Sequence, residues 1–268
     1  MRTISSVVLF LVIGMDLGSG QSQERQQEQP RGIEDNSFLV EEAYNQEAGV
    51  VQHISSGMIV RRNLMYSFTQ EWPLGEQAHQ LSITIPYLTF DSFGTHGIGD
   101  ILINYRYHML LEEHGVAFAP RLSVMLPSGN RSNGTGWGVI GFQTNLPASV
   151  ELSREWVTHF NLGATILPKI EAGGATSTLF SASTAASVIW LVEPEFNLIL
   201  ESVFSSNAGI EDDGRTTRES EFIFNPAVRG AINVGELQIV PGVGIPISFK
   251  GSIAQAGVFV YLSFEHPF

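Results

Sequence analysis

The sequence has no cysteine in 268 residues. This absence excludes disulfides, thiolate catalysis, cysteine-based metal sites and a lipid-modified N-terminal cysteine. Basic residues are also scarce, because 14 Lys and Arg stand against 27 Asp and Glu, which gives a formal net charge of −13. A nucleic-acid backbone is bound by clustered Lys and Arg, and the chain has no basic run, so this composition argues against a nucleic-acid partner.

Long apolar runs are missing as well. After the N-terminal end, no segment offers the roughly 18 uninterrupted apolar residues that indicate a membrane-spanning helix. Yet 43% of the residues are hydrophobic. Inside lipid, only helices and closed barrels satisfy their own backbone hydrogen bonds, so a secreted chain of this composition favours a β-barrel.

The N-terminal end has the layout of a secretory signal peptide. Arg2 precedes an apolar stretch at residues 7–15, and small residues follow at 18–20. An N-terminal core helix is the less favoured alternative. We predict a signal peptide over 1–20, a disordered Gln-rich leader over 21–32, an N-terminal segment over 33–48 and a barrel over 49–268.

Apolar and polar residues alternate from about Gly49 onward. In residues 99–110 the odd-numbered positions from Ile101 are apolar, while Asn104 and Arg106 fall on the opposite face. A period of two predicts β-strands. The predicted strands are 49–60, 64–73, 79–90, 99–110, 115–127, 137–150, 155–167, 176–191, 195–206, 219–233, 237–249 and 255–268.

Charged residues within these strands all fall opposite the bulky apolar residues. They are Glu71, Asp100, Arg106, Arg121, Glu151, Glu155, Glu195, Glu201, Glu219, Glu221, Arg229 and Glu265. A charge that faces lipid at mid-bilayer costs roughly 2–4 kcal/mol on a barrel. The apolar face is therefore predicted to contact lipid and the polar face to line a lumen.

The connections between the strands alternate in length. Short ones lie near 112–114, 153–154, 193–195 and 235–236, and longer ones at 91–98, 128–136, 168–175 and 207–218. This alternation is typical of outer-membrane barrels. We predict an all-β fold, a transmembrane antiparallel up-and-down β-barrel of about 12 strands with short periplasmic turns and longer external loops.

A cluster of charges is predicted inside the barrel. Arg106 and Arg121 should lie side by side across a short turn, and Glu71 or Glu201, with Gln143 nearby, would offset their charge. The expected lumen network is Arg106, Arg121, Glu201, Arg229 and Glu71. It could form a constriction that selects solutes by charge and width, or a packed polar core that only rigidifies the barrel. Side chains fill a barrel of about eight strands, and a barrel of about sixteen strands leaves a channel. A barrel of twelve strands lies between these cases, so the sequence does not decide between a constriction and a packed core.

The stretch NSFLVEEAYNQE (residues 36–47) mixes apolar residues with carboxylates. Phe38 and Tyr44, for example, stand close to Glu41 and Glu42. We predict that residues 33–47 form a tethered plug at the periplasmic mouth or in the lumen. The alternative is a soluble leader whose apolar residues touch the barrel rim.

The sequence gives little indication of a catalytic site or a metal site. Ser263 with Glu265 and His266 is the best local candidate, but Ser263 and His266 fall on opposite faces of a strand, whereas a triad needs hydrogen-bond reach. The acidic residues 211–214 lack the spacing of a calcium loop. We therefore predict no catalytic residues, no metal site and no cofactor.

The final stretch, GVFVYLSFEHPF, alternates and ends on an aromatic residue. As the last strand it must pair with the first to close the barrel. A terminal aromatic after alternating apolar residues resembles the C-terminal signature read by the outer-membrane assembly machinery. We expect Phe268 to serve as an assembly signal, with that machinery and outer-membrane lipid as partners.

Several stretches resemble one family of bacterial outer-membrane proteins. They are IEDNSFLVEEAYNQEAGVVQHI (33–54), QEWPLGEQAHQLSITIPYLTF (70–90) and GIGDILINYRYHM (97–109), and APRLSVMLPSGN and GFQTNLPASVELSREWVTHFNLG continue the likeness. The family is described as transporters and linked by name to the meta-pathway of phenol degradation. The resemblance covers most of residues 33–268. It implies an outer-membrane barrel that passes small molecules, aromatic or hydrophobic ones among them, and it supplies no ligand or catalytic residue.

These observations favour a porin-like passive channel or transporter for small molecules in the bacterial outer membrane. One alternative is a structural or adhesive barrel that displays its external loops. A lipid-modifying outer-membrane enzyme is the other, less favoured one. The sequence does not identify the solute.

Overall fold

The computed structural model describes residues 33, 37–91, 94–109 and 115–268. The predicted signal peptide and leader lie outside the described residues. The described residues belong to one compact unit. Among the described residues, no helix has both the length and the apolar character needed to cross a membrane.

The described residues form one antiparallel sheet of sixteen strands. The strands are β1 (Val50–Val60), β2 (Asn63–Leu74), β3 (Glu76–Phe90), β4 (Thr95–Ile98), β5 (Ile101–Tyr107), β6 (Val116–Phe118), β7 (Arg121–Leu126), β8 (Gly141–Ser153), β9 (Trp156–Ala172), β10 (Ala175–Glu193), β11 (Phe196–Ile210), β12 (Thr216–Gly230), β13 (Ile232–Val234), β14 (Leu237–Gly244), β15 (Ile247–Lys250) and β16 (Ile253–Pro267). Their order around the sheet follows the chain, as an up-and-down barrel requires.

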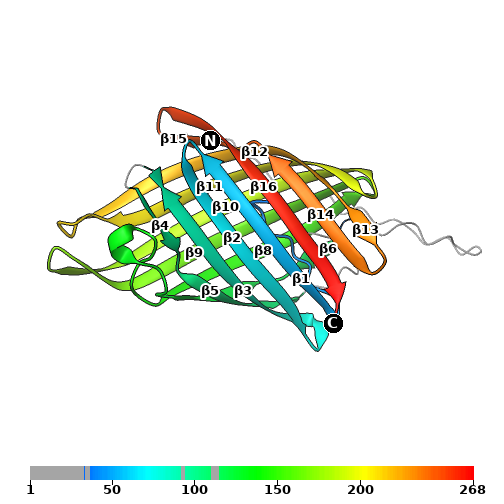
Figure 1. The fold of residues 1–268 in the computed structure, drawn as a ribbon, viewed down its shortest axis with the longest axis horizontal. Coiled ribbons are helices and arrows are strands. Elements are labelled where there is room, and N and C mark those ends of the chain that lie inside the picture. The colour runs from blue at the N-terminus through cyan, green and yellow to red at the C-terminus, as the bar shows by residue number, and fades with distance from the viewer. Residues whose placement is uncertain (1–32, 34–36, 92–93, 110–114) are drawn as a thin grey trace, which may run out of the picture. The chain divides into compact units, whose positions relative to one another are not determined.

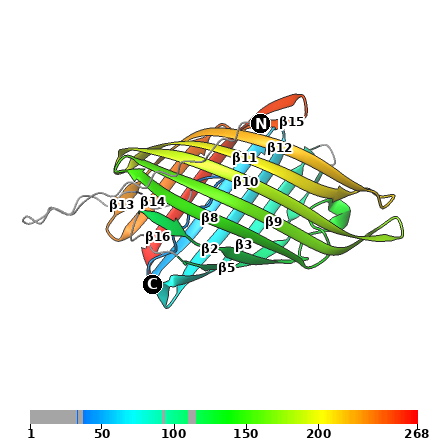
Figure 2. The same cartoon turned by 180° about the vertical axis from the view of Figure 1, so that it is seen from behind.

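The last strand closes the sheet on itself. β16 pairs with β1 from Val50↔Pro267 to Val60↔Gly257, and its other edge pairs with β14 and β15 (Figures 1 and 2). The described long strands thus form a closed ring, and closure is the property that lets a sheet cross lipid. The predicted closed barrel of 12 strands is confirmed.

The count of sixteen exceeds twelve because four barrel strands are each broken into two pieces. The pieces are β4 with β5, β6 with β7, β12 with β13, and β14 with β15. Pro120 and Pro246 lie at two of the breaks, and proline cannot donate to a ladder. At the break before β5, Gly99 donates its N–H to the Pro86 carbonyl at 2.8 Å. A Cβ on Gly99 would lie 2.8 Å from the Pro86 ring, so only glycine fits there.

Side chains alternate between the two faces of the wall. The outward face carries large apolar residues that remain exposed, among them Ile103, Leu122, Phe142, Phe160, Leu162, Phe204, Phe222, Val258 and Val260. Trp156 and Trp190 stack at 5.6 Å on neighbouring strands beside a short turn, as in an interfacial aromatic girdle. A continuous apolar band of this kind around a closed barrel is a lipid-facing surface.

Three of the four expected long loops are shortened because strands continue into them. β9 and β10 leave only Gly173 and Gly174 between them, both with positive φ. β11 and β12 likewise extend beyond the predicted ends, and β4 pairs with β3 inside the expected loop at 91–98. These extensions carry few bulky apolar residues and no regular apolar alternation, so the sequence pattern did not reveal them. The β9–β10 and β11–β12 hairpins project beyond the neighbouring strands in Figure 1.

Candidate functional site in the barrel lumen

The structure places all five predicted lumen residues on the inward face. Arg106, Glu201 and Arg229 are almost completely buried, Glu71 is 7% exposed and Arg121 is partly buried. Arg106 and Arg121 are register partners on β5 and β7. Arg106 Nη2 lies 3.5 Å from Glu71 Oε2, and that carboxylate also accepts a hydrogen bond from Gln80.

Residues 37–47 contact these inward side chains rather than the outside of the barrel. The segment has no regular secondary structure, and Val40 and Ala43 are buried. The Leu39 N–H donates to Glu201 at 2.8 Å, Ala43 N–H to Ser149 at 2.8 Å and Gln46 N–H to Gln80 at 2.7 Å. Buried backbone donors need partners, and an irregular segment finds them on the barrel wall.

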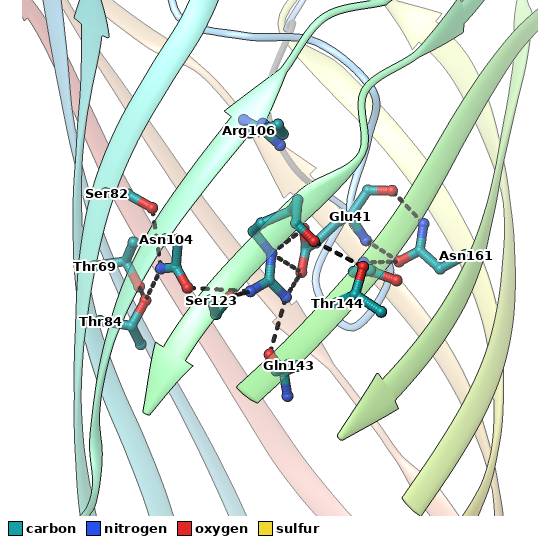
Figure 3. A network of polar contacts seen from close by, with 12 residues as sticks. Glu41, Thr69, Ser82, Thr84, Asn104, Arg106, Ser123, Gln143, Thr144 and Asn161 are labelled. Carbon is teal, nitrogen blue, oxygen red and sulfur yellow. Dashed lines mark hydrogen bonds and ion pairs between the residues drawn. The ribbon is translucent and has the colours of Figure 1, made fainter. Parts of the chain in front are cut away.

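Glu41 is the centre of the polar network. Its carboxylate takes hydrogen bonds from Arg121 Nη2 at 2.6 Å and from Arg121 Nε at 3.0 Å, and its backbone N–H donates to Asn161 at 2.8 Å (Figure 3). Burial raises the pKa of the Glu41 carboxyl, but the charge and hydrogen bonds of Arg121 outweigh that effect and hold the pKa below its ordinary value. Glu41 is therefore a carboxylate at neutral pH.

The carboxylate partner of Arg121 differs from the ones predicted from the sequence. Glu71 and Glu201 were the candidates to offset both arginines. Glu71 lies next to Arg106, but the ion-pair partner of Arg121 is Glu41 of the N-terminal segment. Arg121 also donates to Asn104 and to Gln143, each at 3.1 Å, and contacts the Ser123 hydroxyl. The Gln143 contact was expected, whereas the glutamate from the segment was missed.

Glu201 binds backbone rather than an arginine. Oε1 accepts the N–H groups of Leu39 and Val40 at 2.8 and 3.1 Å, and Oε2 accepts from Asn225 at 2.7 Å. Arg229 donates to the Ile33 carbonyl at 3.3 Å. Glu201 thus holds the segment by its backbone amides, whereas Arg229 contacts Ile33, which precedes the segment.

Replacing Glu201 with alanine should loosen the segment. The variant leaves the N–H groups of Leu39 and Val40 without their acceptor, and a buried donor left without a partner costs about 1–3 kcal/mol. We expect faster amide exchange over residues 37–47, measured by hydrogen–deuterium exchange and mass spectrometry. Glu219→Ala, which changes an exposed glutamate, is the control. Unchanged exchange in the Glu201 variant would show that this carboxylate does not hold the segment.

An aromatic contact anchors the start of the segment. The Phe38 ring stacks on Phe259 at 5.2 Å and on Tyr261 at 5.1 Å between centroids. A Cβ on Gly242 would overlap the Phe38 ring, so glycine at this position makes room for it. Ile54 and Val240 complete the apolar cluster on this side of the lumen.

Two cavities flank the ion pair of Glu41 and Arg121. One has a volume of about 340 Å³ and is lined by hydroxyl and amide side chains such as Asn161, Thr165, Ser181, Ser183 and Ser205. The other has a volume of about 380 Å³ and is lined by Ser67, Thr69, Ser82, Thr84, Asn104 and Arg106, among others. Glu41 and Arg121 line both. The ion pair therefore borders both cavities.

Asp100 holds the loop that contains Gly129 and Trp137. Asp100 is buried, and its two carboxylate oxygens accept the N–H groups of Gly129 at 3.0 Å and Trp137 at 2.8 Å. Trp137 then packs on the inward-facing cluster that includes Leu167 and Leu179. The sequence placed Asp100 on the polar face but gave no sign that it holds this loop.

The structure does not bring the local Ser–His candidate together. Ser263 is buried on the inward face, whereas the His266 ring stacks on His53 on the outward face with their Nε2 atoms 3.3 Å apart. A different pair, missed by the sequence, lies in the lumen: Ser149 Oγ is 2.7 Å from His159 Nδ1. The Ser149 hydroxyl is fully buried and accepts the Ala43 N–H, so the segment covers it.

The acidic loop at 211–214 is held by an arginine. Arg215 lies 2.6 Å from a Glu211 oxygen and 2.7 Å from an Asp213 oxygen. Hydrogen bonds from Arg215 hold the pKa of Asp213 below its ordinary value. Within the part of the chain that the structure describes, no three His, Asp or Glu side chains are grouped to hold a metal.

Comparisons with known proteins identify the fold. No protein-family model matches the chain, and no curated protein matches it in sequence. The structure is similar to the NanC porin, with 9% identity and a TM-score of 0.53 over 81% of this chain and 100% of that one. It is also similar to an outer membrane channel from Pseudomonas putida F1, with 13% identity and a TM-score of 0.57 over 84% of this chain and 98% of that one.

At these identities the likeness shows the fold alone; by name, one neighbour is a porin and the other is an outer membrane channel. The closed 12-strand wall and its apolar outer band agree with that fold. The protein is an outer-membrane β-barrel, and the predicted localisation is confirmed.

Proposed function

We propose that the protein is a passive channel for small molecules, held closed by residues 37–47. The observation that carries this proposal is the polar lumen, in which two cavities of about 340 and 380 Å³ meet at a segment bound only through non-covalent contacts. A barrel that served only to display loops would not need such cavities. The two channel-type neighbours support the same reading.

The mechanism would be diffusion through the lumen after the segment moves. The wall would then present Arg106, Arg121, Glu201, Arg229 and Glu71, so charge and width would select the solute. Hydroxyl and amide groups on the remaining wall favour solutes that can exchange hydrogen bonds with water for hydrogen bonds with protein. No step requires a cofactor.

We also propose the chemical class of the solute. The resemblance to the phenol-degradation transporter family suggests small aromatic or hydrophobic molecules, and it rests on the sequence segments quoted above. The polar cavities favour members of that class with a polar group. Outer-membrane lipid would surround the barrel, and the assembly machinery would be its partner during insertion.

Solute flux into liposomes tests the channel function. We expect the purified full-length barrel to admit glycerol slowly and to exclude a tetrasaccharide, with protein-free liposomes as the control. If neither the full-length barrel nor a variant without residues 33–47 admits glycerol, the channel function is contradicted and a display barrel is the better explanation. Lipid turnover that is lost in Ser149→Ala would instead indicate an enzyme.

A further inference from the structure

The Arg121 side chain forms a site for a carboxylate. Its Nε and Nη2 atoms both donate to the Glu41 carboxylate, at 3.0 and 2.6 Å, which is the forked geometry that arginine uses to bind carboxylates. Asn104, Ser123 and Gln143 on the barrel wall fix the guanidinium from the other side. The wall therefore supplies a preorganised cationic site.

The carboxylate in this site does not belong to the wall. Glu41 comes from the irregular segment, and its side chain is 32% exposed compared with 14% for Arg121. Because both cavities reach the ion pair, a solute that enters either one meets it. A carboxylate of the irregular segment is thus held on an arginine of the barrel wall, and both groups line the two cavities.

A second arginine next to this site has an unused donor. Arg106 is the register partner of Arg121, is only 4% exposed and lines the larger cavity. Among the described residues, its Nε has no hydrogen-bond acceptor. A buried donor without an acceptor beside a cavity is unfavourable, and an anionic oxygen in that cavity would satisfy it.

We propose that Glu41 occupies the place of the solute, and that small carboxylates bind the Arg121 site, displace Glu41 and release the segment. This inference rests on the proposed channel function and names its solute class. One carboxylate replaces another, so Arg121 stays paired throughout. A neutral solute would leave the buried guanidinium uncompensated, which is strongly unfavourable, and would not displace Glu41.

The test measures how accessible residues 37–47 are by labelling a cysteine introduced into them. The sequence has no cysteine of its own that would react with the label. Ser37 is 2% exposed, so a maleimide should modify Ser37→Cys slowly in the detergent-solubilised full-length barrel. We expect propionate to raise the labelling rate at least about fivefold, the lower end of typical coupling between a ligand and a conformational state. Propionamide, its neutral counterpart, and chloride at equal ionic strength should leave the rate unchanged.

Further substitutions in the Ser37→Cys variant distinguish release of the segment through the Arg121 site from a general loosening of the segment. Glu41→Gln should label fast without propionate, and Arg121→Gln should not respond to propionate at all. Arg62→Gln, which changes an exposed rim arginine, should respond like the parent. Heat-modifiable mobility on gels checks that each barrel is folded.

Two results would overturn the inference. One is an unchanged labelling rate with propionate in the parent, and the other is an equal response to propionamide. Both leave the channel function standing if liposomes still admit glycerol, because labelling reports the site and flux reports the channel.

Discussion

Deleting residues 33–47 should raise the conductance of the reconstituted barrel by at least about tenfold, which corresponds to removing about 1.4 kcal/mol of closing free energy. The deletion removes the Phe38 anchor, the ion pair to Arg121 and the amides bound by Glu201. Water can then solvate the inward charges, so the emptied lumen stays wet and open to ions. Single-channel recordings in planar bilayers measure the change.

A second deletion serves as the control for this experiment. Removing residues 21–32, the predicted polar leader, shortens the chain by a similar length but keeps the contacts of residues 37–47. We expect its conductance to match that of the full-length barrel. An unchanged conductance after removal of 33–47, in a barrel that still shows heat-modifiable mobility, would show that the segment does not close the channel.

Phe268→Ala should sharply reduce the amount of folded barrel in the outer membrane. The Phe268 ring is 73% exposed, while its backbone N–H donates to the Gly49 carbonyl at 3.0 Å, and alanine keeps that backbone hydrogen bond. We therefore propose that the ring acts during assembly rather than in the finished wall. Heat-modifiable protein in outer-membrane fractions measures the effect.

The same variant refolded in detergent should be about as stable as the parent, since surface substitutions away from special features usually change stability by within about 0.5 kcal/mol. Phe180→Ala, another lipid-facing aromatic, is the matched control in cells. Normal insertion of the Phe268 variant would remove the assembly role. Equal loss for Phe180 would indicate a general need for outward aromatics instead.

The barrel wall could be predicted because its signal is local. Alternation along a strand reports which side chain meets lipid, and Ile103, Leu122 and Phe160 lie outward as their phase requires. Strand ends were less predictable where hairpins extend as polar ribbons, as around Gly173. These hairpins project beyond the neighbouring strands (Figure 1), where we expect no lipid to impose an apolar face.

The site could be predicted only in part. The adjacency of Arg106 and Arg121 follows from register across one turn, whereas the pairing of Glu41 with Arg121 joins residues 80 positions apart through an irregular segment. An irregular segment has no sequence periodicity from which the direction of its side chains could be predicted. Only its mixture of apolar and acidic residues indicated a position in the lumen. Asp100 likewise shows its role only when the loop containing Gly129 and Trp137 is folded.

The seam between β1 and β16 has a consequence for biogenesis. Residues 37–47 join β1 through Gly49, a positive-φ residue, and β1 closes against β16, which follows all the other strands in the chain. The segment can therefore be enclosed while the two edges of the wall are still apart. We expect such a barrel to enter the membrane with its lumen already filled by residues 37–47, so that insertion opens no pore.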